Sequence, residues 1–317
     1  MPSFAVKKLY ASDEDAFDKE LASLTSVKAD EGVHLIKLLT TFSVEEEGRK
    51  TFYLVFPWAE GTLWDYWERN KLKDKHDRLT RTPWMAREIY EIARALQCVH
   101  NERRQHLKHY PGLSSGKDEL YGRHGDIKAE NILYFSGDNT LVISDFGLGR
   151  LQTKYSRSNN NPKALEKSAT YRAPEFDLTD GRISRASDVF SLGCMYLEFV
   201  TWYLKGYDAV SDEFPEYRME KDATWGFESD TFFTIENGKP IIKPKVQQWI
   251  EMLRKHKDAS AYTDQFLDTI EKMLAPASEG RIKISKLTQQ LDLFRETCER
   301  DPSYYGGESP SRSYVFH

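Results

Sequence analysis

The middle of the chain carries two carboxylates, a lysine and an amide at close spacing, all between His124 and Asp145. Asp126, Lys128 and Asn131 lie in one run, His-Gly-Asp-Ile-Lys-Ala-Glu-Asn, and Asp145 opens a later Asp-Phe-Gly. Moving a phosphoryl group from a nucleotide to a hydroxyl requires positioned charge more than covalent chemistry from the protein. Asp126 can orient or accept the proton of the attacking hydroxyl. Lys128, two residues further along an extended loop, points the same way and can neutralise the moving phosphate.

A metal site can be built from Asn131 and Asp145. An amide oxygen and a charged carboxylate are both hard ligands suited to Mg²⁺. Two short apolar runs, 132–135 and 141–143, are separated by the turn residues Ser-Gly-Asp-Asn, which predicts a hairpin. Asn131 and Asp145 stand at its two open ends, so one metal ion can draw on both.

The alternative is that Asp126 and Asp145 are turn residues with solvated carboxylates. A short motif is a hypothesis that needs context. The context here is order, because the run around Asp126 is followed by Asp-Phe-Gly at 145–147 and by Ala-Pro-Glu at 173–175. Three motifs in this order do not arise easily by chance, which favours phosphoryl transfer.

These three motifs give the chain a resemblance to the eukaryotic protein kinases, whose signature is His-Arg-Asp-Leu-Lys-x-x-Asn, Asp-Phe-Gly and Ala-Pro-Glu. One position departs, since Gly125 stands where the family usually has arginine. The resemblance implies a serine/threonine protein kinase that uses ATP and Mg²⁺. Lys128 indicates the serine/threonine branch, and Thr170 would contact the catalytic aspartate. The implied fold is α+β and bilobal, with a mainly helical C-terminal lobe.

The nucleotide phosphates would be held near the N-terminus. Residues 4–7 form a strand pattern that ends in Lys7 and resembles the family's third strand, whose lysine holds the α- and β-phosphates. An acidic run at 13–15 favours the start of a helix, and Glu20 on this helix would fix Lys7. Both residues could instead be solvated surface charges, but the downstream motifs favour the functional role.

The adenine pocket would follow two more strands, over 33–41 and 51–56, joined by an exposed turn at 45–48. Phe56 would guard the back of this pocket, and the hinge would run from Pro57 to Ala59. Because Pro57 has no N–H, hydrogen bonds to an adenine edge must come from carbonyls and from the Ala59 N–H.

One part of the family pattern is missing. Only six residues precede Lys7, and the sequence contains no Gly-x-Gly-x-x-Gly motif. The sequence is therefore expected to have a truncated N-terminal β lobe, either as a fragment or as a natural chain that binds nucleotide weakly or not at all. The alternative function is then a pseudokinase or interaction scaffold, although the retained catalytic residues argue against it. A small-molecule phosphotransferase is a third possibility, opposed by a peptide-substrate platform at 173–175.

By resemblance, Glu175 of this platform pairs with Arg281, and Asp188 hydrogen-bonds the backbone of the catalytic loop. The polar segment between Asp145 and Glu175 has the composition of a mobile activation segment. Protein kinases often order it with a phosphate bound to the arginine that is Gly125 here. We therefore predict that activation does not depend on a phosphate held at Gly125.

The domain prediction comprises a partial N-lobe (1–56), a hinge and C-lobe (57–300) and a mobile tail (301–317). Insertions are expected at 101–123 and 202–244. The first follows a helix capped by Thr82 with Pro83 in its first turn. It carries a basic cluster that is either a docking patch or a solvated loop: Arg103, Arg104, His106, Lys108 and His109.

Composition limits the remaining partners. A net charge of −5 and a pI near 6 argue against nucleic-acid binding driven by bulk charge. The longest apolar stretch, 189–204, contains Glu198 and is short for a bilayer, so a buried helix is expected. The three cysteines have no metal-type spacing and read as reduced thiols, with Cys98 and Cys194 buried. A cytoplasmic or nuclear protein is predicted, with no secretory signal and no membrane partner, acting on protein substrates with a serine or threonine acceptor.

Overall fold

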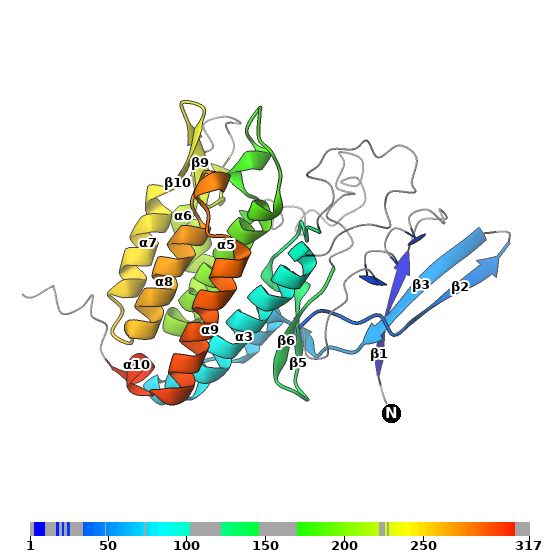
Figure 1. Ribbon diagram of the computed structural model, residues 1–317, viewed down its shortest axis with the longest axis horizontal. Coiled ribbons are helices and arrows are strands. Elements are labelled where there is room, and N and C mark those ends of the chain that lie inside the picture. The colour runs from blue at the N-terminus through cyan, green and yellow to red at the C-terminus, as the bar shows by residue number, and fades with distance from the viewer. Residues whose placement is uncertain are drawn as a thin grey trace, which may run out of the picture.

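The computed structural model describes residues 3–9, 17, 18, 21, 24, 25, 34–47, 49–72, 74–101, 122–145, 170–221, 226 and 228–307. Their α-helices and strands are β1 (Phe4–Leu9), β2 (Thr40–Glu46), β3 (Arg49–Pro57), β4 (Gly61–Thr62), α2 (Leu63–Arg69), α3 (Lys75–Asn101), β5 (Ile132–Phe135), β6 (Thr140–Ile143), α5 (Arg185–Lys205), α6 (Phe214–Arg218), β7 (Glu220–Lys221), β8 (Glu228–Ser229), β9 (Phe233–Glu236), β10 (Lys239–Ile242), α7 (Pro244–Arg254), α8 (Ala261–Met273), α9 (Ile284–Arg300) and α10 (Ser303–Gly306). Short helical turns lie at Ala129–Asn131, Pro174–Phe176, Ala209–Glu213 and Ser278–Gly280. Figure 1 shows a small N-terminal sheet at one end and most helices at the other, so the predicted α+β class is confirmed.

The N-terminal sheet is antiparallel in the order β1-β3-β2. Lys7 of β1 pairs with Leu54 of β3, so their side chains share one face of the sheet. Phe52 lies on this same face and stacks on Phe17, with ring centroids 4.4 Å apart. Leu54 is fully buried. The face that forms the core of this lobe therefore also carries Lys7.

The strand predicted over 33–41 lies further along the chain in the structure, where β2 runs from Thr40 to Glu46. Leu35 instead forms a bridge to Ile143 of β6, which ties this part of the chain to the helical lobe. The turn predicted over 45–48 is narrower because its first two glutamates still pair with β3.

The helix predicted to begin at Thr82 begins earlier, because α3 starts at Lys75 and contains Pro83 in its interior. Thr82 is fully buried, and its hydroxyl donates to the Arg78 carbonyl over 3.0 Å and lies 2.7 Å from the Tyr203 hydroxyl. A proline inside a helix removes one backbone hydrogen bond. The long buried face that α3 packs against α5 and α9 offsets this loss.

Helix α5 forms the centre of the large lobe and is buried along nearly its whole length, as predicted for the apolar stretch 189–204. Its N-terminus is capped by Ser184, whose hydroxyl accepts a hydrogen bond from the Ala186 N–H over 3.2 Å. It ends before Gly206, which adopts a φ of 95°. Among the described residues, no helix has both the length and the hydropathy needed to cross a bilayer.

The segment predicted to be irregular over 202–244 is largely regular where the structure describes it. Helix α5 continues to Lys205, and α6 and the β9–β10 hairpin follow. Phe214 and Phe232 are fully buried, and Phe214 stacks on Trp249 at 4.9 Å. The aromatic residues of this segment thus belong to the main hydrophobic core of the large lobe, which composition alone did not reveal.

The tail predicted to be mobile over 301–317 begins instead with α10. Tyr304 of this helix packs edge-on against Tyr262, with centroids 5.9 Å apart. Residues 308–317 lie outside the described residues, and so do residues 102–121 of the first predicted insertion.

All three cysteines are free thiols. Cys194 and Cys298 are buried. Cys98 is only partly buried, because it lies at the edge of the buried stripe of α3 rather than within it.

Candidate active site

The loop that carries Asp126 is fixed to the core by Asp188, near the start of α5. The two carboxylate oxygens of Asp188 accept the backbone N–H groups of His124 and Gly125, each over 2.8 Å. His100 from α3 adds a third contact, at 2.8 Å from Oδ2. Burial would raise the pKa of Asp188, but the hydrogen bond and charge of His100 outweigh it and hold the pKa below the usual value. The predicted anchoring of the loop by Asp188 is confirmed.

His124 connects this loop to the strand end that carries Asp145. Its Nδ1 accepts the N–H of Asp126 over 3.2 Å, and its Nε2 lies 2.8 Å from the Ser144 carbonyl. Burial lowers the pKa of His124, which favours the neutral ring, with the proton on Nε2 donated to Ser144. The sequence motif contained His124 but did not indicate that it bridges the two halves of the site.

Two predicted residues of the loop, Lys128 and Asn131, both contact the carboxylate of the third, Asp126. Lys128 Nζ lies 3.0 Å from Asp126 Oδ2, so the two side chains point the same way, as their spacing predicted. The Asn131 amide nitrogen donates to Asp126 Oδ2 over 2.9 Å and to the Asp126 carbonyl over 2.7 Å. Both N–H groups of Asn131 are thereby engaged on Asp126. The Asn131 oxygen is the atom left to serve as an acceptor or a ligand.

The predicted hairpin brings Asn131 and Asp145 together. Strands β5 and β6 pair with Ile132 opposite Ile143. Beyond this pair, the Ser144 N–H donates to the Asn131 carbonyl over 2.9 Å. Asp145 follows directly, in the left-handed backbone region at a φ of 56°. The register therefore places one amide and one carboxylate at the same end of the hairpin.

Lys7 reaches the same place from the N-terminal sheet. Its Nζ lies 2.9 Å from Asp145 Oδ1, with the two side chains 37% and 44% exposed. Asp145 Oδ2 and the Asn131 oxygen are the donors that suit a hard cation. Among the described residues no cluster of three or more His, Cys, Asp or Glu could hold a metal by protein ligands alone. Two oxygen ligands from the protein suit a metal ion whose remaining ligands are phosphate oxygens.

A cavity of about 320 Å³ opens beside this pair, between the N-terminal sheet and the β5–β6 hairpin. Its lining includes Lys7, Phe56, Pro57, Ala59 and Asp145, all predicted to be near the nucleotide. Apolar side chains form much of the remaining wall: Ala5, Val6, Leu24, Ile36 and Leu133. A small, mainly apolar cleft with charged groups at one side is typical of a small-molecule site.

Two predicted contacts of the site stay predictions. Thr170 donates its hydroxyl proton to Asp230 Oδ1 over 2.7 Å, and its expected contact with Asp126 is not tested. Glu20 and residues 146–169 lie outside the described residues, so the Lys7–Glu20 pair is not tested.

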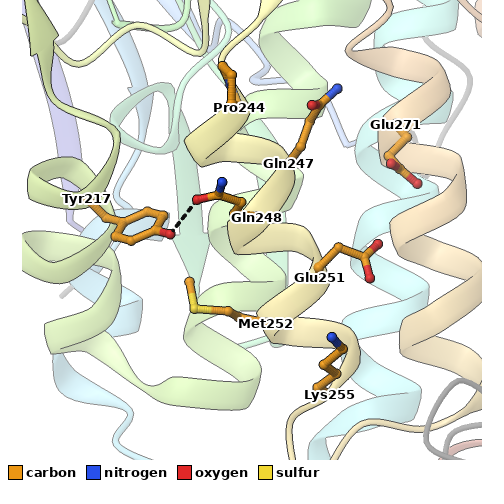
Figure 2. Close-up of a pocket in the computed structure, with 8 residues that line it drawn as sticks. All are labelled: Tyr217, Pro244, Gln247, Gln248, Glu251, Met252, Lys255 and Glu271. Carbon is orange, nitrogen blue, oxygen red and sulfur yellow. Dashed lines mark hydrogen bonds between the residues drawn. The ribbon is translucent and has the colours of Figure 1, made fainter. Parts of the chain in front are cut away.

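A second hollow, of about 490 Å³, lies away from these residues on α7 and α8. Figure 2 shows Tyr217 pointing toward Gln248, whose side-chain oxygen accepts its hydroxyl proton over 2.9 Å. Glu251 and Lys255 project from the same helix. No residue predicted to be catalytic or nucleotide-binding lines this hollow.

Comparison of the sequence with known proteins identifies its family. Residues 2–291 match the protein kinase domain. The chain is 30% identical to mitogen-activated protein kinase 15 of Xenopus laevis over 202 residues, which cover 62% of this chain and 30% of that protein. It is 27% identical to extracellular signal-regulated kinase 2 of Dictyostelium discoideum over 204 residues, which cover 62% of this chain and 47% of that protein.

A third relative is CTD kinase subunit alpha of Schizosaccharomyces pombe, 27% identical over 196 residues, which cover 59% of this chain and 29% of that protein. The aligned part of the chain thus spans less than half the length of each of these relatives. The domain match extends over nearly the whole chain. The chain therefore belongs to the protein kinase domain family.

Proposed function

We propose that the chain transfers the γ-phosphoryl group of ATP to serine or threonine hydroxyls of protein substrates. The observation that carries this proposal is that Lys128 and Asn131 both contact the carboxylate of Asp126, and that the Lys7–Asp145 pair lines the cavity. Each of these side chains has a role in phosphoryl transfer. A scaffold that only binds partners has no chemical need for them.

In this proposal Asp126 Oδ2 orients the acceptor hydroxyl and receives its proton. Lys128, held 3.0 Å away, offsets the negative charge that builds up at the transferred group. Asn131 fixes Asp126 by its two hydrogen bonds and keeps its own oxygen for the metal. ATP supplies the phosphoryl group, and Mg²⁺ held by Asn131 and Asp145 supplies the neutralising charge.

The hinge gives the cavity its selectivity for a planar base. Phe56, Pro57 and Ala59 all line the cavity. Pro57 offers only its carbonyl, so the Ala59 N–H is the donor that would face the base. Lys7 has to exchange part of its contact with Asp145 for the phosphates. Because both side chains are partly exposed, this exchange has only a small free-energy cost.

The competing proposal is an interaction scaffold that binds nucleotide weakly or not at all. Both proposals keep a protein partner and a cytoplasmic or nuclear setting, for which the free thiols are suited. They differ in what ATP does to the folded chain.

A thermal-shift titration with Mg·ATP separates the two proposals. Binding to the folded state alone stabilises it by about 2.7 kcal/mol at a hundredfold excess over Kd. The kinase proposal expects an upward shift in melting temperature at millimolar Mg·ATP, and the scaffold proposal expects none.

Phosphoryl transfer is then measured with labelled ATP and a generic basic protein. Asp126→Asn is expected to reduce transfer by about a hundredfold or more, since it removes the proton acceptor. Asp138→Asn is the matched control, because Asp138 is an exposed turn carboxylate of the same hairpin. Equal transfer by the wild type and Asp126→Asn would overturn the catalytic assignment.

A further inference from the structure

An arginine from α6 is buried in the large lobe beside the segment that ends in Ala-Pro-Glu. Arg218 is 1% exposed, and its guanidinium lies over the rings of Phe214 and Phe232, at 4.3 Å and 4.6 Å. A buried charge requires partners. Arg218 finds two carboxylates, Glu198 of α5 and Asp230, each at 3.4 Å from its Nη2. Its Nε also donates to the Asp230 carbonyl over 2.7 Å.

Asp230 divides its carboxylate between two partners. Arg218 contacts Oδ2, and the Thr170 hydroxyl donates to Oδ1 over 2.7 Å. The Asp230 side chain is 31% exposed, so it lies at the boundary between the buried arginine and the protein surface. A hydrogen bond to a carboxylate is stronger than one between neutral groups. The hydrogen bond to Asp230 therefore fixes the Thr170 side chain.

The next residue is held by the same network. The Tyr171 hydroxyl donates to Glu198 Oε2 over 2.5 Å, and its ring stacks on Phe232 at 6.3 Å. Thr170 and Tyr171 are both buried. Thr170 and Tyr171, which Arg172 separates from Ala-Pro-Glu, are therefore fixed by side chains from α5 and from the segment between α6 and β9.

A second buried cation, Lys243, fixes the backbone on both sides of Asp230. Lys243 is 2% exposed, and its Nζ donates to the carbonyls of Ser229 and Arg218 over 2.7 Å and 3.1 Å. The Lys243 N–H donates to the Phe232 carbonyl over 3.1 Å. Asp230 therefore lies on backbone that is held on both sides, which suits a residue that positions another.

We propose that Asp230, held by Arg218, is a positioning residue that fixes the hydroxyl of Thr170 and with it the platform on which the acceptor peptide binds. This inference rests on the proposed protein kinase function and assigns a role within it to the segment 206–243. Asp230 does not touch the phosphates or the proton in transit. Its loss should weaken binding of the protein substrate more than it slows the transfer step.

The test compares Asp230→Ala, Thr170→Val and the double variant in a phosphoryl-transfer assay with a protein substrate. The expected result for Asp230→Ala is a rise of about tenfold in KM for the protein, with KM for ATP unchanged and kcat within about threefold. Thr170→Val removes the same hydrogen bond and should raise KM for the protein at least as much; its kcat is not used, because Thr170 is also predicted to contact Asp126. The double variant should raise KM for the protein no more than Thr170→Val alone, because the contact that Asp230→Ala removes is already lost in Thr170→Val. Asp208→Ala, an exposed carboxylate of the same segment, is the matched control.

Hydrogen exchange of the backbone amides of residues 170–176 gives a readout that needs no catalysis. Faster exchange by about tenfold in both single variants, with α5 unchanged, supports the positioning role. Should Asp230→Ala not fold, Thr170→Val carries the exchange test alone. An unchanged KM together with unchanged exchange overturns the proposal, and so do additive losses in the double variant. If the wild type transfers no phosphate, the proposed function fails while the exchange comparison still decides the contact.

Discussion

Glu175 and Arg281 face each other through two parallel hydrogen bonds, from Nη1 to Oε1 and from Nη2 to Oε2, each 2.7 Å long. Their side chains are 5% and 0% exposed. Ser187 donates a third hydrogen bond to Glu175 over 2.7 Å, and Arg281 also donates to the carbonyls of Ala275 and Pro276. The pair, which sequence resemblance predicted, joins the Ala-Pro-Glu segment to the loop before α9 with its polar groups satisfied.

Breaking this pair should be costly. Replacing Arg281 with Met leaves the Glu175 carboxylate buried without its partner, and we expect a loss of roughly 3–5 kcal/mol in the free energy of unfolding. Urea denaturation measures the loss. Glu299→Gln is the control, because Glu299 forms an exposed pair with Arg295 and should cost less than about 1 kcal/mol. Similar losses in the two variants would contradict the buried role of the pair.

The same pair predicts how stability depends on acid. Burial would raise the pKa of Glu175, but the hydrogen bond and charge of Arg281 and the hydrogen bond of Ser187 outweigh it and lower the pKa below 4.5. A carboxyl with a lowered pKa in the folded state stabilises the fold above the unfolded value and loses that contribution as pH falls through the folded value. The difference in stability between the wild type and Glu175→Gln should therefore shrink below pH 4.5. Urea denaturation at pH 3.5, 4.5 and 6 checks this.

Replacing Lys7 should change stability little and activity strongly, whereas replacing Arg281 should lower stability strongly. The Lys7–Asp145 pair is 37% and 44% exposed, and pairs at this exposure add little stability. Lys7→Met is thus expected to change the free energy of unfolding by less than about 1 kcal/mol while phosphoryl transfer falls by about a hundredfold. Lys8→Met, which alters the neighbouring strand residue, is the control. A stable Lys7→Met variant with full activity would remove Lys7 from the site.

The short-range parts of the site could be predicted from the sequence. The spacing of Asp126 and Lys128 in an extended loop fixes their common direction, and the hairpin turn fixes Asn131 beside Asp145. These relationships depend on few residues and on backbone geometry that local sequence determines. The Glu175–Arg281 pair spans 106 positions and was accessible only through the family resemblance.

Contacts made by the segment 206–243 could not be predicted. Asp230 meets Thr170 across 60 positions, and Arg218 is buried, where charged residues are rare. No periodic pattern marks such contacts, because they join side chains that are far apart in the sequence. The early start of α3 was missed for a related reason, since tertiary packing overrides the usual preference of proline for a helix N-terminus.

Gly125 gives a further prediction about the catalytic loop. Its φ of 85° lies in the left-handed region, where a Cβ costs roughly 1–2 kcal/mol. Gly125→Ala should lower the free energy of unfolding by about this amount. Gly137→Ala is the matched control, because Gly137 lies in an exposed turn with open space around its missing Cβ and should be nearly neutral. Equal effects of the two variants in urea denaturation would contradict the backbone argument.

The absence of an arginine at this position also concerns activation. A phosphate in the segment 150–169 has no side chain at Gly125 with which to pair. Phosphatase treatment is therefore expected to leave the rate of transfer within about twofold of the untreated protein. Loss of activity on treatment, with recovery after rephosphorylation of that segment, would show that the phosphate is held in another way.

Glu198 is a carboxyl group buried inside the large lobe. It lies in the core of α5, and burial raises its pKa to about 7, with the charge of Arg218 and the hydrogen bond from Tyr171 opposing the rise only in part. A carboxyl with a raised pKa in the folded state binds its proton more tightly there than in the unfolded chain. Its contribution to stability is complete below pH 4.5 and is lost as pH rises through 7.

Glu198→Gln removes this titration while keeping the shape of the side chain. The free energy of unfolding of the wild type, relative to that of Glu198→Gln, should fall by roughly 3 kcal/mol between pH 4.5 and pH 8. The comparison with the variant is needed because burial lowers the pKa of His124 and His256, and these groups add stability as pH rises over part of the same range. Urea denaturation of both proteins at pH 5, 6, 7 and 8 measures the difference. A difference that stays constant with pH would mean that Glu198 is ionised at neutral pH, and the buried Arg218 would then be paired with a full negative charge.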